Sequence, residues 1–389
     1  MISREILKKI RQIELRTNRL VCGLLCLGLP AFLCSCATAS RQATTTPATE
    51  LPADVLINKE AGRGGHLMVT LRLETGEELP FMVDTGSPAT LLDKSLESKL
   101  GKRLGTMPVR NASGSKQTSG VFPATKLYLG NTRLVTGDRV LSYDFTQHPM
   151  GLLGMDCLRH YCIQLDFESG KMRFLNSAQM DAAGLGKAFP LSFKDGYPFI
   201  HSSNLVGESA DLLIDVGCTI DGFLDRGTNK FEGAYLPECH WSSETYSNLI
   251  VVAPGNVNAL GLRFLARHLV TLDFPNQTLY LKRIAAGPSD EIESADLGES
   301  ARKSGLKFLM RQLEKGQLPG WSTGGKEPVY FEEHSAADSK SVSFTFRGKN
   351  GSTSSHYAIA RTEENVPWQL QKAWQTDRDG KMTEDYLVP

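Results

Sequence analysis

An internal repeat in the middle of the chain constrains the fold more than any other feature of the sequence. The segment GLLGMDCLRHY followed by IQLDF, which begins at Gly151, recurs from Asn258 as NALGLRFLARH followed by VTLDF, at a constant offset of 107 residues. Upstream, LPFMVDTGS from Leu79 matches ADLLIDVGC from Ala210 at an offset of 131 residues. Because self-similarity at a fixed spacing indicates a duplicated structural unit, we expect two homologous halves.

Short alternating apolar runs and turn residues give both halves a mainly β character. Strands are expected at 67–73 and 199–205, ahead of the two Asp-x-Gly turns, and each half then continues through a Leu-Gly turn and a short helix into a closing hairpin. The first half is longer, and its surplus contains the polar, glycine-bounded segment 111–120. We expect this segment to be a loop in a hairpin that overhangs a cleft.

The string FMVDTGS around Asp84, with a Leu-Gly pair at 153–154, resembles the aspartic proteases of the pepsin and retropepsin type. The resemblance covers roughly residues 54–284. It implies two pepsin-like β lobes with a cleft between them, in which Asp84 and Asp215 form a catalytic pair. It also implies that the substrate is a peptide or protein and that no metal or organic cofactor takes part.

In that family, two Asp-Thr-Gly turns meet across a pseudo-two-fold axis and bring two carboxyl groups together. The resemblance therefore assigns Thr85, Gly86, Ser87 and Gly217 to the active-site loops. Two carboxylates at such close range cannot both ionise, so they share one proton and titrate as a pair. The ionised partner would take a proton from water that attacks the peptide carbonyl, and the protonated partner would donate to the carbonyl oxygen.

The second turn departs from this pattern, because Val216 replaces the Thr and Cys218 replaces the Ser. Val216 has no hydroxyl group to hydrogen-bond across the loops, so we expect Thr85 to lose its mirror partner. Two functions are therefore considered, according to whether the altered second turn still supports catalysis. One is an aspartic endopeptidase, and the other is a catalytically inactive, pepsin-like lipoprotein that binds peptides or proteins in the cell envelope. The distance between the two carboxyl groups distinguishes them.

The amino terminus predicts export. A basic leader precedes an apolar stretch at 20–33, which is too short to span a bilayer comfortably and is typical of a signal peptide. The following LCSC resembles the bacterial lipobox, so Cys36 is the expected lipidation site, and its fatty acyl chains would hold the protein at a membrane of the cell envelope. An ordinary signal peptide and an uncleaved anchor are the alternatives.

Composition adds little about partners. Lys plus Arg and Asp plus Glu are equal at 43 each, so the formal net charge is zero and nothing favours nucleic acid as a partner. The eight histidines show no metal-ligand spacing. Four cysteines follow the leader, and the sequence leaves open whether they pair or stay free, as it leaves the oligomeric state open.

The remainder of the chain predicts a small α+β domain. Apolar spacing indicates a helix at 300–317, and later alternating segments indicate an antiparallel sheet on which it packs. The predicted organisation is a signal peptide, a tether, two aspartic-protease-like lobes, a linker and this domain, at 1–36, 37–53, 54–182, 183–284, 285–297 and 298–389 respectively.

Overall fold

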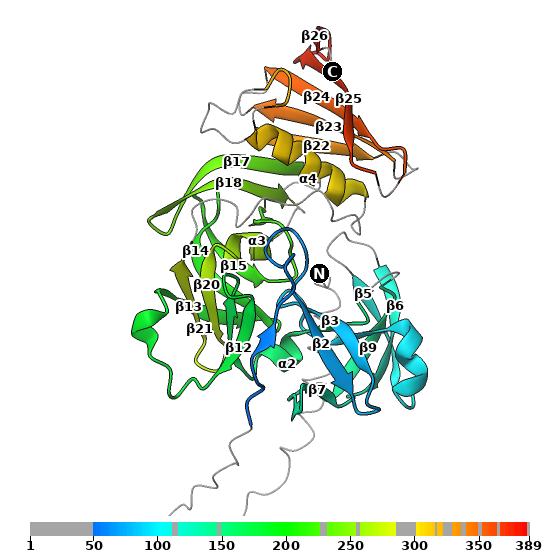
Figure 1. Ribbon diagram of the computed structural model, residues 1–389, viewed down its shortest axis with the longest axis vertical. Helices are drawn as coiled ribbons and strands as arrows, with labels where there is room; N and C mark the ends of the chain where they lie inside the picture. The colour runs from blue at the N-terminus through cyan, green and yellow to red at the C-terminus, as the bar shows by residue number, and fades with distance from the viewer. Residues whose placement is uncertain are drawn as a thin grey trace, which may run out of the picture.

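The computed structural model describes residues 50–386 except 111–115, 146–148, 226–231, 254–256, 285–300, 316, 322–328, 336–339, 349–351 and 364–365. The predicted signal peptide, Cys36 and most of the tether lie outside the described residues. The described chain is mainly β, as predicted, with two large mixed sheets and few, short helices (Figure 1). No helix within it is long and apolar enough to cross a membrane.

The first repeat forms a nine-stranded sheet. In this sheet the strand that ends at the first aspartate, β3, runs parallel to the strand that ends at the Leu-Gly turn, β10. The strands, in their order across the sheet, are β5 (Gly105–Arg110), β6 (Lys116–Pro123), β9 (Arg139–Tyr143), β4 (Leu91–Asp93), β10 (Gly151–Leu153), β3 (Glu78–Val83), β2 (Met68–Leu73), β7 (Leu127–Leu129) and β8 (Thr132–Arg133).

The second repeat has the same strand order and the same relative directions. Its aspartate-bearing strand β15 runs parallel to β19, as β3 does to β10. The corresponding strands are β22 (Val329–Ser335), β17 (Glu232–Trp241), β18 (Glu244–Ala253), β16 (Gly222–Phe223), β19 (Asn258–Gly261), β15 (Ser209–Asp215) and β14 (Tyr197–Ser203). The outermost of these, β22, comes from the carboxyl-terminal part of the chain and takes the place that β5 has in the first repeat.

A six-stranded antiparallel layer joins the two repeats. At its centre, the repeat-equivalent residues Gln164 and Thr271 lie directly opposite each other, and their side chains hydrogen-bond at 3.1 Å. A pseudo-two-fold axis therefore passes between them. The strands of this layer are β1 (Val55–Leu56), β12 (Lys171–Leu175), β11 (Cys162–Asp166), β20 (His268–Asp273), β21 (Thr278–Arg283) and β13 (Lys187–Lys194).

Each Leu-Gly turn leads into a one-turn helix, α2 (Met155–Leu158) or α3 (Leu262–Leu265). Glycine is required before each helix because the two chain segments touch there. A Cβ at Gly154 would lie 2.3 Å from the carbonyl oxygen of Ala89, and one at Gly261 would lie 2.2 Å from that of Ile220. Each helix is thus held against the loop that follows the aspartate of its own repeat.

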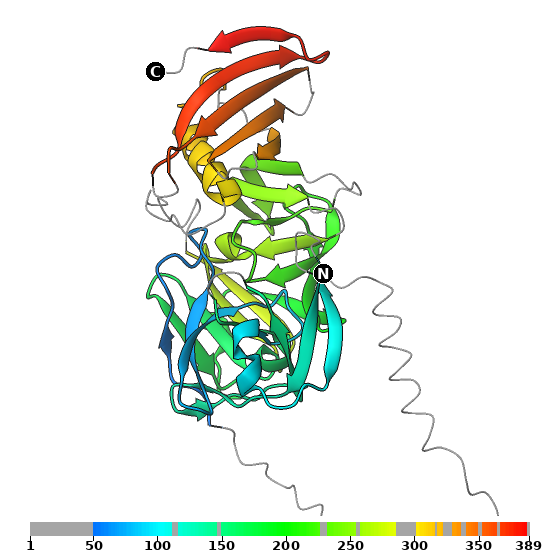
Figure 2. The same cartoon turned by 90° about the vertical axis from the view of Figure 1, so that its right-hand side faces the viewer.

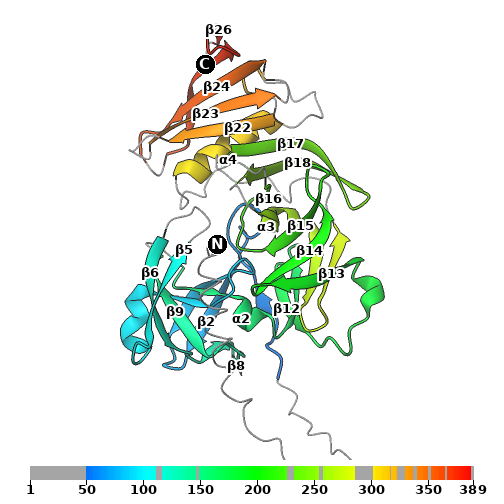
Figure 3. The same cartoon turned by 180° about the vertical axis from the view of Figure 1, so that it is seen from behind.

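The carboxyl-terminal segment continues the second-repeat sheet outward from β22. Helix α4 (Ala301–Glu314) contacts β22 and β23 (Ser341–Gly348), and beyond them lie β24 (Thr353–Ala360), β25 (Gln369–Asp377) and β26 (Met382–Tyr386). Figures 1 and 3 show the two repeats side by side with this unit above the second, and Figure 2 shows its curved sheet from the side.

Residues 116–120 were expected in a polar loop, but they form the first part of strand β6, because a regular ladder with β5 satisfies their backbone groups. The rest of that loop, 111–115, lies outside the described residues. Cys157, Cys162, Cys218 and Cys239 are all buried, and these four cysteines form no disulfide with one another.

Glycine at position 233 of β17 allows the carboxyl-terminal strand to dock. A Cβ there would lie 1.9 Å from the ring of the buried Phe331, whereas a Cβ at Gly105 would meet nothing within 4 Å. We predict that Gly233→Ala lowers the free energy of unfolding by about 1–3 kcal/mol through overpacking. The control Gly105→Ala should change it much less. Chemical denaturation measures both, and equal effects would contradict the close packing of β22 on β17.

Candidate active site

Equivalent backbone frameworks deliver the two aspartates to the same place. Strand β3 ends one residue before Asp84, whose N–H donates to the carbonyl oxygen of Leu153 at 3.0 Å. Strand β15 ends at Asp215, which lies opposite Gly261. Each strand lies between one parallel and one antiparallel neighbour, so the position of each carboxyl group is fixed by the sheet.

The two aspartate loops pack against each other through their glycines. A Cβ at Gly217 would lie 2.3 Å from a carboxyl oxygen of Asp84, and a Cβ at Gly86 would lie 2.5 Å from one of Asp215. Only glycine leaves room for this exchange of contacts. The two carboxyl groups consequently come within hydrogen-bonding reach of each other. Of the residues that the sequence assigned to the site, the structure brings Asp84, Asp215 and these two glycines together.

The shared site raises the pKa of both carboxyl groups, but not equally. Burial, and then the charge of Asp215, hold the pKa of Asp84 well above its usual value of 3.8. Burial also raises the pKa of Asp215, but the N–H groups of Gly217 and Cys218 donate to one of its oxygens at 2.9 and 3.1 Å and oppose the shift. Asp84 accepts a bond at 2.7 Å from the Gly86 N–H. Asp215 thus accepts one more N–H bond than Asp84, and this favours the charged form of Asp215 within the pair.

The Thr85 hydroxyl bridges the two loops by itself. It donates to the carbonyl oxygen of Ile214 at 2.6 Å and accepts from the N–H of Val216 at 3.0 Å. Both partners are backbone groups, so they do not depend on the side chain at position 216. Thr85 has no mirror threonine, as expected, but it still makes two hydrogen bonds across the loops. Val216, 1% exposed, contributes apolar packing in place of the reciprocal hydroxyl.

Ser87 and Cys218 also make corresponding contacts. The Ser87 hydroxyl donates to the carbonyl oxygen of Ala89 at 2.8 Å, and the Cys218 thiol points to that of Ile220 at 3.9 Å. In each loop the side chain thus bonds the backbone two residues on. The cysteine is a weaker donor in the same role, and Ser87 acts on its own loop.

Two residues near the aspartates were missed in the sequence. Extending the strand register places Tyr197 opposite Asp215 and His66 opposite Asp84. Burial, followed by the charges of Asp84 and Asp215, raises the pKa of Tyr197, which keeps its hydroxyl protonated. The usable signal was positional, since each residue precedes its aspartate by 18 positions.

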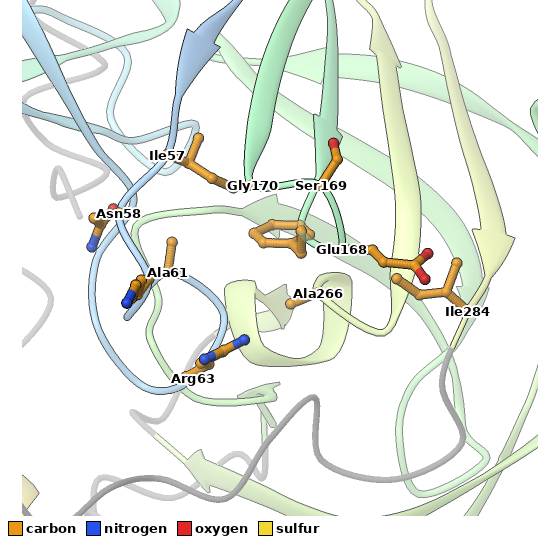
Figure 4. A pocket seen from close by; sticks show the side chains of 11 residues that line it. Ile57, Asn58, Ala61, Arg63, Glu168, Ser169, Gly170, Ala266 and Ile284 are labelled. Atoms are coloured by element: carbon orange, nitrogen blue, oxygen red, sulfur yellow. The ribbon is translucent and has the colours of Figure 1, made fainter.

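Elsewhere, a surface pocket of about 490 Å³ lies between the segment 57–63, the β11–β12 turn and helix α3 (Figure 4). Neither aspartate lines it. Within the described residues no group of three or more His, Cys, Asp or Glu side chains is arranged to hold a metal ion. The aspartate pair, with the raised pKa values of both carboxyl groups, is the candidate active site.

Removing the bridging hydroxyl should loosen the two loops. Thr85 is 1% exposed, so Thr85→Val leaves two buried backbone groups without their partner. We predict a loss of about 1–3 kcal/mol in the free energy of unfolding. Thr85→Ser keeps the hydroxyl and should lose much less. Thermal and chemical denaturation of both variants test this, and an equal loss would show that the methyl group, not the hydrogen bonds, matters.

Comparison with known families agrees with this geometry. Residues 69–157 match the model of a family described as aspartyl protease. The match spans the first aspartate loop, strands β3 to β10 and the start of α2. No curated protein matches the chain. The first repeat thus contains an aspartyl protease family domain, which supports an aspartic peptidase activity.

Proposed function

We propose that this protein is an aspartic endopeptidase that hydrolyses peptide bonds with a water molecule activated by Asp84 and Asp215. The observation that carries the proposal is the pair of facing, buried carboxyl groups whose pKa values are both raised. General acid–base catalysis on a peptide needs one group of each kind on the same site.

The unequal environments assign the roles. Asp215, held as a carboxylate by two N–H donors, accepts a proton from the water. The water oxygen forms a bond to the peptide carbon while Asp84 gives its proton to the carbonyl oxygen. In the resulting diol the peptide nitrogen takes the proton that Asp215 holds, and a diol hydroxyl returns its proton to Asp84. The C–N bond then breaks, and the carboxylic acid and the amine leave.

Retention of the Thr85 bridge favours the enzyme over the inactive binding module. The second loop lacks a threonine, yet its backbone is still tied to the first loop at Ile214 and Val216. Because both aspartates belong to one chain, the pair assembles without a second subunit.

Exchange of either carboxyl group tests the proposal. We predict that Asp84→Asn and Asp215→Asn each abolish cleavage of a denatured protein or peptide library. Asp211→Asn, which alters an exposed carboxylate paired with Lys194, should leave cleavage unchanged. Since both pair members have raised pKa values, wild-type activity should fall at low pH as Asp215 protonates and at higher pH as Asp84 ionises. Activity that survives in either variant would exclude the shared mechanism.

A stability measurement gives a check that does not need a substrate. A carboxyl group whose pKa is raised by folding destabilises the fold once the pH exceeds its unfolded value, because ionisation then opposes burial. Asp84→Asn should therefore increase the free energy of unfolding near pH 7. The increase should vanish below about pH 4, where Asp84 is protonated in both states.

We also propose that the protein is exported and anchored by lipid on Cys36 at the bacterial envelope. The support is the sequence LCSC at the end of the apolar stretch. Cys36→Ala should abolish labelling by a radioactive fatty acid and release the protein from the membrane fraction. Cys34→Ala serves as the matched control and should keep both. Labelling that persists in Cys36→Ala would contradict this anchor.

A further inference from the structure

Each aspartate loop is joined to the one-turn helix of its own repeat by a contact between two side chains. In the first repeat, the Thr90 hydroxyl donates to a carboxyl oxygen of Asp156 at 2.7 Å. In the second repeat, Arg263 forms a hydrogen-bonded ion pair with Asp221. Thr90 and Asp221 each follow their aspartate by six positions and directly precede strands β4 and β16. Asp156 and Arg263 each follow the glycine of a Leu-Gly turn by two, so the two contacts occupy corresponding places.

The second-repeat contact differs from the first because it is a buried ion pair. Asp221 is 0% exposed and Arg263 is 4% exposed. The guanidinium group of Arg267 lies 2.9 Å from the other carboxyl oxygen of Asp221, and the Ile250 N–H donates to the oxygen that Arg263 contacts, at 2.7 Å. Taking such charges out of water costs stability, whereas the first repeat makes the same connection with a single hydrogen bond. A fixed geometry is the gain that a buried ion pair can offer in return.

The ion pair holds helix α3 in place from two sides. Besides contacting Asp221, the Arg263 guanidinium donates to the carbonyl oxygen of Asn248 in β18 at 3.0 Å. On the backbone, the N–H of Gly261 donates to the carbonyl oxygen of Asp221 at 2.9 Å. Figure 3 shows α3 beside β16, the strand that Asp221 precedes. The helix, the second aspartate loop and β18 are therefore connected through one guanidinium group.

Helix α3 in turn holds the loop that carries Asp215. The N–H of Leu262, the first residue of α3, donates to the carbonyl oxygen of Cys218 at 2.7 Å. The N–H of Cys218 donates to a carboxyl oxygen of Asp215 at 3.1 Å. A shift of α3 against the loop would therefore move one of the two N–H groups that favour the charged form of Asp215.

The second loop also has a weaker internal bond than the first. The Ser87 hydroxyl donates to the backbone of its own loop at 2.8 Å, whereas the Cys218 thiol lies 3.9 Å from the carbonyl oxygen of Ile220. A thiol is a weak donor, so this contact gives the second loop less support. Asp221 is the next residue along the chain, and its ion pair thus acts where the second loop lacks the stronger bond.

We propose that Asp221 and Arg263 are positioning residues for Asp215, whose ion pair fixes helix α3 against the second aspartate loop and keeps the second carboxyl group in place for the reaction. This inference rests on the proposed endopeptidase function. Neither residue has to touch the peptide. Because a misplacement of about 1 Å at a reacting group can cost on the order of 100-fold in rate, the effect belongs to kcat and not to KM.

The experiment compares Asp221→Thr with the wild type in steady-state peptide cleavage across the pH range. The variant breaks the ion pair, and kcat per folded molecule should fall about 10- to 100-fold while KM changes little. The low-pH limb of the kcat profile should move to higher pH, because weaker N–H support raises the pKa of Asp215. Loss of the Asp221 charge alone would lower that pKa, so an upward shift reports the loop. Asp84 and Tyr197, whose charges interact with that of Asp215, are unchanged in this variant.

A second variant tests the same idea by rescue. Asp221→Thr combined with Arg263→Asp gives the second repeat the threonine and aspartate that the first repeat has in the corresponding places. It should recover most of the lost kcat and return the low-pH limb towards its wild-type position. Gly233→Ala, which lowers stability through β22, is the control for destabilisation alone. It should change neither kcat per folded molecule nor the pH profile, with the folded fraction measured by near-ultraviolet circular dichroism.

The outcomes separate this inference from the function on which it rests. Wild-type kcat and pH profile in folded Asp221→Thr would overturn the inference and leave the endopeptidase intact. If the single variant does not fold, the double variant decides, and a folded double variant without activity would overturn the inference. Absence of wild-type cleavage at every pH would overturn the endopeptidase function and this inference with it. A loss in kcat that the double variant reverses supports the positioning role.

Discussion

Two carboxyl groups that face each other with little access to water are the constraint on which the rest of the structure depends. Such a pair repels itself when fully ionised, and its burial disfavours charge altogether. The protein holds Asp84 and Asp215 together through the sheets behind them, through Gly86 and Gly217 between them and through the Thr85 hydroxyl across them. This cost in stability is acceptable only where it has a use, which is why strongly shifted carboxyl groups indicate function.

Much of this arrangement could be predicted from the repeat alone. The two repeat spacings predicted the positions of the aspartates, the Leu-Gly turns, the short helices and the closing hairpins. Each of these features depends on a local sequence pattern that duplication preserves. The role of Thr85 could not be judged in the same way. Its partners are backbone groups of Ile214 and Val216, and a sequence comparison reveals side chains only. Tyr197 and His66 were missed because no motif marks them, although their equal spacing from the aspartates was visible.

The carboxyl-terminal segment illustrates a second limit. Its helix and strands were predicted by periodicity, with α4 four amino acids shorter than expected. Periodicity gave no indication that β22 pairs with β17, because strand partners separated by a long stretch of chain leave no local trace. Gly233 was the available sequence signal for this pairing, since a glycine within a strand often marks a close approach by another group. The domain boundaries proposed from composition stay predictions.

Strand β22 comes from the carboxyl-terminal part of the chain, and this constrains the order in which the two sheets can form. All strands of the first-repeat sheet lie between Met68 and Leu153, so that sheet can form as soon as this stretch is available. The second-repeat sheet receives its outer strand from Val329–Ser335, far beyond Ala253, and closing so long a loop slows the pairing. Until β22 pairs with β17, the edge of β17 is unpaired and the side chains of Tyr235 and Ile250 are exposed to solvent. A chain that crosses a membrane from its amino terminus would expose this edge during export, and this half of the molecule is where a chaperone or a quality-control protease would be expected to act first.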